Sequence, residues 1–209
     1  SFATATHRAP RFAQDGMKGE ERWIRLELKL LADVGIVGMP NAGKSTLIGK
    51  VSAARPKVAE YPFTTLTPNL GVVVLAGSDP FVVADIPGLI GGAHAGAGLG
   101  IKFLRHIERT HILIHLIDVS GGAQSAWADF ETINRELALF SAALEGKPQI
   151  VAFNKIDLAE DRKEIRKGIG FFRKKGMVVF AISARTGEGV DALMAEVARR
   201  LASEKEGRK

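Results

Sequence analysis

The stretch VGIVGMPNAGKSTLI, residues 34–48, decides the fold of this chain. Its apolar start predicts a short buried strand, and its closing Ser-Thr-Leu-Ile run is typical of the first turn of a helix. Between them, Gly38 and Gly43 let backbone N–H groups turn inward around an anion, and the helix N-terminus adds partial positive charge. We therefore predict a strand, a phosphate-binding loop and a helix, in that order.

The loop residues suit a nucleotide bound with a divalent cation. Lys44 is expected to reach the β and γ phosphates, and the Ser45 hydroxyl is expected to ligate Mg²⁺. The alternative, a glycine-rich turn without a ligand, is disfavoured by the strand and helix on either side. The residues expected to contact nucleotide here are Gly38, Met39, Pro40, Asn41, Ala42, Gly43, Lys44, Ser45 and Thr46.

Composition limits the class of protein. The chain has 209 residues, a formal net charge of +6 and no cysteine, which excludes disulfides, thiolate metal sites and cysteine nucleophiles. The longest apolar candidate for a membrane span, residues 112–119, is interrupted by His115 and Asp118 and is far shorter than the ~18 residues that a span needs. We expect a soluble, cytoplasmic monomer, for which the positive charge makes an anionic partner such as RNA plausible.

Apolar periodicity alternates between strand and helix along the chain. This alternation predicts an α/β fold in three layers, with a mostly parallel six-stranded sheet and helices on both faces. The predicted strands are 34–38, 72–75, 81–85, 112–119, 149–154 and 178–183. The predicted helices are 44–53, 99–109 and 160–174, with two more marked by apolar stripes, one at Phe130, Ile133, Leu137, Phe140 and Leu144 and one at Val190, Leu193, Met194, Val197 and Leu201.

The segment FVVADIPG, residues 81–88, places Asp85 at the end of an apolar strand. Its carboxylate can hold the hydration shell of Mg²⁺, and the Gly88 N–H, beyond Ile86 and Pro87, can meet a γ phosphate. Taken alone, the segment fits an ordinary turn better, because Asp, Pro and Gly are common turn residues.

The segment IVAFNKID, residues 150–157, ends the predicted strand 149–154 with Asn154, followed by Lys155 and Asp157. The Asp157 carboxylate can accept two hydrogen bonds from the ring N–H and the exocyclic amine of guanine. Adenine does not present that pair of donors, so this segment favours a guanine nucleotide.

The last predicted strand ends with Ser183, Ala184 and Arg185, where the Ala184 N–H can contact guanine O6. The carboxyl ends of parallel strands meet at one edge of a sheet, and ligands bind there. The phosphate loop, Asp85 and Asn154 are expected at the same edge. The order of these four segments resembles that of the Ras-like P-loop GTPases over residues 31–203.

Longer stretches resemble the Obg (CgtA) GTPases of the TRAFAC class. They are ERWIRLELKLLADVGIVGMPNAGKSTLI at 21–48, YPFTTLTPNLGVV at 61–73, VVADIPGLI at 82–90 and GAGLGIKFLRHIERT at 96–110. The resemblance implies a GTP-binding protein with slow Mg²⁺-dependent hydrolysis that acts as a switch in assembly of the large ribosomal subunit, with rRNA and protein as partners. The alternative is a sensor of nucleotide state in growth or stress signalling, with incidental hydrolysis.

The resemblance also assigns the first switch. Thr65 would close over the nucleotide and complete the Mg²⁺ shell together with Ser45 and Asp85. A plain loop before the next strand is the alternative. The neighbours expected to flank the nucleotide with Thr65 are Phe63, Thr64, Leu66 and Thr67.

Catalysis is expected to be slow. Ras-like enzymes place a glutamine after the DxxG segment to orient water, whereas this chain has Leu89, which cannot hydrogen-bond to water. In related GTPases an asparagine in the position of Asn41 helps K⁺ to neutralise charge between the phosphates, and a purely structural role for Asn41 is equally open. The expected catalytic residues are Lys44, Thr65, Gly88 and Asn41.

Other segments carry lesser expectations. We interpret His111 and His115 as packed or hydrogen-bonded scaffold. The basic run 162–175 predicts an amphipathic helix whose charged face is either solvated or in contact with rRNA. The resemblance implies three regions: the end of an N-terminal Obg-type domain with its linker at 1–30, the GTPase domain at 31–203 and a charged tail at 204–209.

Overall fold

The computed structural model describes residues 16–23, 32–53, 57–58, 69–86, 108 and 110–206. Within these ranges the strands form one sheet of seven in the order β2-β3-β4-β1-β5-β6-β7. β2 and β3 are antiparallel, as are β3 and β4, and all other pairs are parallel. The strands are β1 (Val34–Val37), β2 (Lys57–Val58), β3 (Asn69–Val73), β4 (Phe81–Asp85), β5 (Ile112–Asp118), β6 (Gln149–Asn154) and β7 (Val179–Ala181).

The predicted mostly parallel sheet is confirmed, with one strand more than the six expected. The extra strand, β2, has two residues and is too short to give an apolar pattern. β3 begins at Asn69 rather than at residue 72, because Leu70 and Gly71 already pair with Ala84 and Val83 of β4. The other strands lie within a few residues of their predicted bounds.

The described helices are α1 (Lys44–Val51), α3 (Ala126–Phe140), α4 (Ala142–Glu145), α5 (Arg162–Lys174) and α6 (Val190–Glu206). The predicted helix at 99–109 lies outside the described residues except for position 108. The stripe that we predicted from Phe130 to Leu144 is divided between two helices. Ser141 is extended, with φ −162°, and its hydroxyl accepts a hydrogen bond from the Ala143 N–H, so a new helix begins there.

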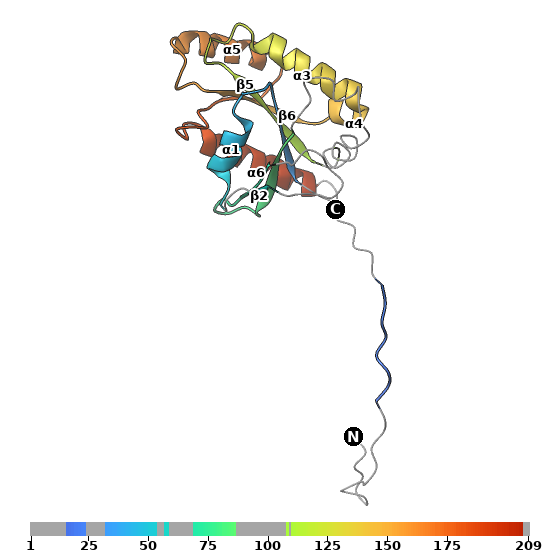
Figure 1. The fold of residues 1–209 in the computed structure, drawn as a ribbon. Helices are drawn as coiled ribbons and strands as arrows, with labels where there is room; N and C mark the ends of the chain where they lie inside the picture. Colours follow the sequence, from blue (N-terminus) through green and yellow to red (C-terminus); the bar gives the residue numbers. More distant parts are fainter. Residues whose placement is uncertain are drawn as a thin grey trace, which may run out of the picture.

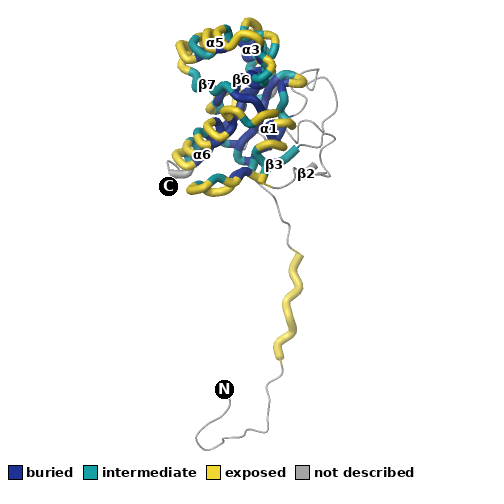
Figure 2. Tube along the Cα trace, turned by 90° about the vertical axis from the view of Figure 1, so that its left-hand side faces the viewer, coloured by how far each residue is buried: buried dark blue, intermediate teal, exposed yellow. Residues whose placement is uncertain are grey.

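The helices cover both faces of the sheet, so the three-layer prediction is confirmed. α1 and α6 pack on one face through residues such as Leu47, Ile48 and Leu193. α3, α4 and α5 cover the other face through residues such as Ile133 and Phe172. Figure 1 shows these two helical layers with the strands between them. Figure 2 shows buried strands inside and exposed outer faces on the helices.

The two ends of the described chain differ in structure. Residues 16–23 are exposed and have no regular secondary structure, with Trp23 fully exposed. At the other end, α6 continues to Glu206, so the beginning of the expected charged tail is helical.

Across the described ranges of the chain, no helix is both long enough and apolar enough to span a membrane.

Candidate nucleotide-binding site

The phosphate loop follows β1, which lies between β4 and β5 in the sheet. After β1 the chain forms β2, β3 and β4 on one side of it, and then β5, β6 and β7 on the other side. The strand order therefore reverses at β1. Ligands bind at this point in open α/β sheets. The helix α1 begins at Lys44, directly after the loop, and directs its N-terminus toward the same place.

Two glycines are required to shape this loop. Gly38 has φ 153°, and a Cβ there would lie 2.2 Å from the carbonyl oxygen of Leu116. Gly43 has φ 97°, and a Cβ there would lie 2.4 Å from the amide nitrogen of Asn154. Any side chain at either position would collide with neighbouring strand ends. These close contacts explain why both loop positions are occupied by glycine.

The Lys44 ammonium is held across the loop. Its Nζ donates to the carbonyl oxygens of Gly38 at 3.0 Å and Met39 at 3.2 Å. Burial lowers the pKa of Lys44, and the charge of Asp85 opposes that shift. A positive charge that is partly removed from water interacts strongly with an anion placed in the loop.

Asp85, at the end of β4, and Ser45, in the first turn of α1, face each other. The Ser45 hydroxyl donates to Asp85 Oδ2 at 3.2 Å and accepts from the side-chain amide of Asn69 at 3.3 Å. Burial raises the pKa of Asp85, whereas the Lys44 charge and hydrogen bonds from the Ser45 and Asn69 side chains lower it. Sequence analysis missed Asn69, because the strand that carries it begins earlier than predicted.

This pair fits a magnesium ion. Asp85 is 6% exposed, and its buried Oδ1 has no hydrogen-bond partner among the described residues. An unpartnered carboxylate oxygen is costly to bury, and a cation or a water bound to it would satisfy it. Oxygen donors from a carboxylate and a hydroxyl are the ligands that Mg²⁺ prefers.

Asn154, at the end of β6, joins three parts of the site. Its Nδ2 donates to the Ala42 carbonyl oxygen at 2.7 Å, and its Oδ1 accepts from the Ala184 N–H at 2.9 Å. Ala184 N–H, which we predicted to contact guanine O6, is thus engaged by the protein itself. Asn154 is 2% exposed, so both bonds are protected from water.

Lys155 adopts an unusual backbone conformation. Its φ is 65°, a left-handed value that is uncommon for a residue other than glycine. Its ammonium lies 2.6 Å from Asp118 Oδ2. Hydrogen bonds from Lys155 and Ser120 outweigh the effect of burial and hold the pKa of Asp118 below its ordinary value. Such local strain clusters at functional sites when the surrounding contacts maintain it.

Sequence analysis assigned no function to Asp118. It is the last residue of β5, at the same sheet edge as the other predicted residues. The rule that ligands bind beyond the carboxyl ends of parallel strands could have identified it. Its position inside an otherwise apolar run hid that signal.

Asp157 is oriented by the last strand end. Its Oδ2 lies 2.8 Å from Arg185 Nη2 and 3.1 Å from Arg185 Nε. A hydrogen bond from the Ser183 hydroxyl holds the pKa of Asp157 below its ordinary value, and the Arg185 charge acts in the same direction. Asp157 is therefore a carboxylate at neutral pH and can only accept hydrogen bonds.

Asn41 has φ 62°, again in the left-handed region, and is exposed. Asparagine tolerates this conformation better than most residues, so Asn41 has at least a role in shaping the loop. Pro40 and Thr46 are also exposed around the loop, whereas Ile86 is buried and donates its N–H to the Ile36 carbonyl oxygen at 3.0 Å.

Several predicted site residues lie outside the described residues. They are Phe63, Thr64, Thr65, Leu66, Thr67, Pro87 and Gly88, together with Leu89. The structure therefore brings the phosphate loop, Asp85 and the two guanine segments together, and both switch segments stay predictions.

The two histidines form part of the scaffold, as predicted. His115 is 1% exposed, its ring lies 4.7 Å from that of Phe130, and its Nδ1 is 3.3 Å from Gln149 Oε1. Burial lowers the pKa of His115 to about 4. His111 Nδ1 lies 3.1 Å from Glu204 Oε2.

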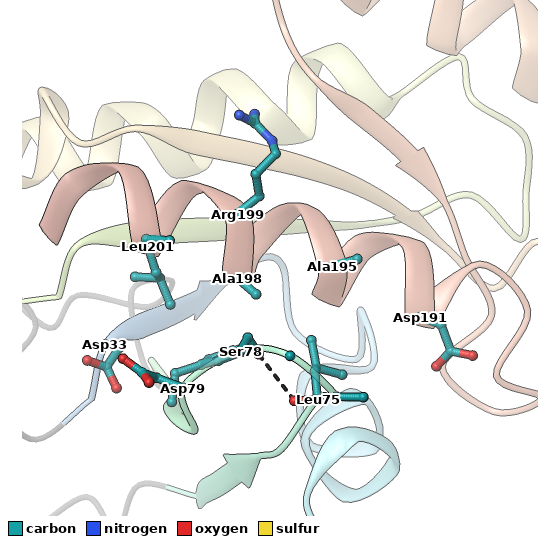
Figure 3. Close-up of a pocket in the computed structure, with 13 residues that line it drawn as sticks. Asp33, Leu75, Ser78, Asp79, Asp191, Ala195, Ala198, Arg199 and Leu201 are labelled. Carbon is teal, nitrogen blue, oxygen red and sulfur yellow. Dashed lines mark hydrogen bonds between the residues drawn. The ribbon is translucent and has the colours of Figure 1, made fainter. Parts of the chain in front are cut away.

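A separate cavity of about 650 Å³ lies between α6 and the turn that joins β3 to β4. Figure 3 shows Asp33 and Asp79 at one end and Asp191 at the other, with the side chain of Arg199 directed away from the turn. Asp33 Oδ2 accepts from the Val82 N–H at 2.8 Å, so this carboxylate holds the start of β4. The cavity includes none of the predicted nucleotide contacts.

Comparison with known proteins identifies the family of this chain. The family described as 50S ribosome-binding GTPase matches residues 33–155. The GTPase Obg of Syntrophus aciditrophicus is 60% identical over 202 residues, which are 96% of this chain and 59% of that protein. The GTPase Obg of Moorella thermoacetica is 56% identical over 205 residues, 97% of this chain and 48% of that protein. The chain thus spans about half to three-fifths of the length of these relatives.

Solved structures agree on the fold. Aquifex aeolicus Era bound to GDP and AlF4⁻ aligns with a TM-score of 0.60 at 25% identity, covering 80% of this chain and 56% of Era. The G domain of the T. maritima FeoB iron transporter aligns with a TM-score of 0.55 at 26% identity, covering 81% of this chain and 97% of that domain. The chain belongs to the 50S ribosome-binding GTPase family, and its relatives in that family are GTPases Obg.

Proposed function

We propose that this chain binds guanine nucleotide and hydrolyses GTP slowly with Mg²⁺, as a switch in assembly of the large ribosomal subunit. The observation that carries the proposal is the convergence at Asn154, whose one side chain bonds to the phosphate loop and to the last strand end. Asp157 and Arg185 lie beside this junction. These contacts would hold a phosphate site and a base site at a fixed separation.

Base selection rests on Asp157. As an ionised carboxylate it accepts hydrogen bonds from the ring N–H and the amine of guanine. Its contacts with Arg185 and Ser183 keep it ionised and oriented. Lys155, held by Asp118, would flank the base from the neighbouring strand end. The Ala184 N–H already donates to Asn154 Oδ1. If it also contacts guanine O6, it must share its hydrogen between the two oxygens.

The chemistry is transfer of the γ phosphoryl group to water. When bound, Mg²⁺ would supply positive charge that stabilises the phosphate oxygens. Lys44 places its ammonium at the loop, and loop N–H groups with the α1 N-terminus attract phosphate charge. Ser45 and Asp85 would hold the ion. Thr65 and Gly88 would sense the γ phosphate through the two switch segments.

We further propose that K⁺ assists hydrolysis through Asn41, since Leu89 offers no hydrogen bond to the attacking water. The exposure of Asn41 supports this role, because an exposed residue of the loop is accessible to a cation from solvent. Single-turnover hydrolysis in KCl should exceed that in NaCl at equal ionic strength, and Asn41→Ala should remove the difference. Equal rates in the two salts would exclude the K⁺ role while leaving GTP hydrolysis itself in place.

The domain assignment accompanies this proposal. Residues 31–203 would form the GTPase domain, residues 1–30 the end of the preceding domain and its linker, and residues 204–209 a charged tail. The support is that relatives matched over nearly this whole chain are considerably longer. We propose a cytoplasmic monomer whose docking on the large subunit requires the longer protein.

The function as a whole can be tested by phosphate release and by capture. Purified protein should release phosphate from GTP slowly in Mg²⁺, and EDTA or Asp85→Asn should reduce the rate at least about tenfold. Full-length protein locked with a non-hydrolysable GTP analogue should recover large-subunit particles from lysate, and the GDP form should recover fewer. Recovery of a lone regulatory protein instead would favour signalling over assembly.

A further inference from the structure

A groove of about 330 Å³ lies between the start of α3 and the length of α5. Its walls are Trp127 and the preceding loop on one side and Lys167, Phe171 and Phe172 on the other. The loop before α3 approaches α5 closely because α5 carries Gly168, where a Cβ would lie 2.7 Å from the Ala123 side chain. The groove shares no residue with the nucleotide site described above.

The groove presents aromatic surface to solvent. Phe171 is 44% exposed and Trp127 is half-buried, and their ring centroids lie 5.3 Å apart in an edge-to-face arrangement. Phe172 is buried beneath them, 5.2 Å from the ring of Trp127. Burying a large aromatic side chain is favourable. An exposed Phe171 ring beside a groove therefore indicates a surface that binds a partner.

Positive charge surrounds these rings. The Lys175 ammonium lies 5.2 Å from the ring centre of Trp127 and 5.7 Å from that of Phe171. Lys167 is exposed at the groove wall. Residues 162–175 hold seven lysines and arginines against one acidic residue, Glu164, whose carboxylate accepts a hydrogen bond from Gln124 at 3.2 Å.

We propose that this α3–α5 groove binds single-stranded RNA. Flat π surfaces beside cations match the stacked bases and phosphates of a single strand. One base would stack on the exposed ring of Phe171, beside Trp127, while Lys167 and Lys175 meet the adjoining phosphates. The cavity volume holds one or two bases, and an amphipathic helix would need a longer apolar stripe with anchors over two turns. The site deepens the proposed role on the large subunit, because it names the surface that would contact rRNA, and it does not depend on GTP hydrolysis.

Trp127 provides a direct readout. The chain has two tryptophans, and Trp23 is fully exposed and does not line the groove. In a Trp23→Phe background, emission of Trp127 should be quenched by a 12-nucleotide oligouridylate or oligoadenylate. Inorganic polyphosphate, which has charge but no bases, should quench little. Equal quenching by polyphosphate, or none by the oligonucleotides, would overturn the proposal.

Two variants separate stacking from charge. Phe171→Ser should weaken oligonucleotide binding about tenfold, because loss of one stacking partner is worth about that much. Lys167→Gln with Lys175→Gln should lower the slope of log affinity against log salt by about 1.4, since each phosphate contact to a single strand contributes about 0.7. Unchanged affinity in Phe171→Ser, or an unchanged salt slope in the double variant, would contradict the proposed contacts.

The matched control is Leu139→Ala. Leu139 is an exposed apolar residue of α3, 70% exposed and not part of the groove. Its substitution should leave oligonucleotide affinity unchanged, and comparable weakening in Leu139→Ala would overturn the assignment to this groove. GDP affinity, measured for every variant, should stay at the unsubstituted value. Loss of RNA binding with intact GDP binding therefore tests this site separately from the proposed GTPase function.

Discussion

The side-chain nitrogen of Asn154 lies 2.7 Å from the carbonyl oxygen of Ala42, although 112 positions separate the two residues in sequence. The bond joins the strand end that would select the base to the loop that would hold the phosphates. Both residues are buried, so the bond does not compete with water. The loop that contains Ala42 is thereby tied directly to the buried end of β6.

Substituting Asn154 should therefore damage stability as well as binding. Asn154→Ala leaves the Ala42 carbonyl and the Ala184 N–H without this partner, and we expect the free energy of unfolding to fall by about 2–4 kcal/mol. Urea unfolding monitored by circular dichroism measures this loss. The control is Asn134→Ala, on α3, whose side chain bonds to the Phe130 carbonyl and to Gln149 rather than to the loop, and which should leave GDP affinity unchanged. Wild-type stability in Asn154→Ala would contradict the bridging role.

Asp118→Asn should weaken nucleotide binding through Lys155. The substitution removes the charge that holds the Lys155 ammonium at 2.6 Å, next to a backbone in the left-handed region. We expect GDP affinity to fall up to about fivefold, the range of a partly exposed ion pair. Glu188→Gln removes another ion pair, with Arg162, and should have no effect. Equal affinity in both variants would show that Asp118 does not position Lys155.

Asp157→Asn should change which base is bound. The amide presents a donor where guanine needs an acceptor, so GTP affinity should fall at least about 100-fold. Xanthine nucleotides should then bind better to the variant than to the unsubstituted protein. Competition of GTP, XTP and ATP against a fluorescent GDP analogue measures the change. A variant that keeps the original base preference would exclude Asp157 from base selection.

The buried His115 should make stability depend on pH. Its pKa is lowered from 6.5 to about 4 in the folded protein, so between these values the unfolded chain binds a proton that the folded chain does not. Stability from this residue is fully present above pH 6.5 and falls as pH falls toward 4. Between pH 7.5 and 5.0 we expect a loss of about 2 kcal/mol.

His115→Gln isolates this contribution. Glutamine is neutral throughout the range and retains a polar group near Gln149. Urea unfolding at both pH values should show a loss about 2 kcal/mol smaller in the variant than in the unsubstituted protein. The same pH dependence in both proteins would assign the acid sensitivity to other groups.

Sequence alone predicted the sheet and the edge where the site forms, because buried strands and the glycine-rich loop carry strong local patterns. It could not predict β2, which is too short to show alternation, or the break at Ser141, where one hydroxyl begins a new helix inside a continuous apolar stripe. Long-range contacts were equally hidden. The sequence around Asp118 does not predict its contact with Lys155, and the sequence around Asn69 does not predict its contact with Ser45.

The central claim is that this sheet edge selects a guanine nucleotide with Mg²⁺. Isothermal titration of the chain with GTP, GDP and ATP in MgCl₂ tests it most directly. We predict saturable binding of GTP and GDP with one site per chain, and ATP binding at least about 100-fold weaker. Binding of ATP as tight as that of GTP, or no binding of either guanine nucleotide, would contradict the account.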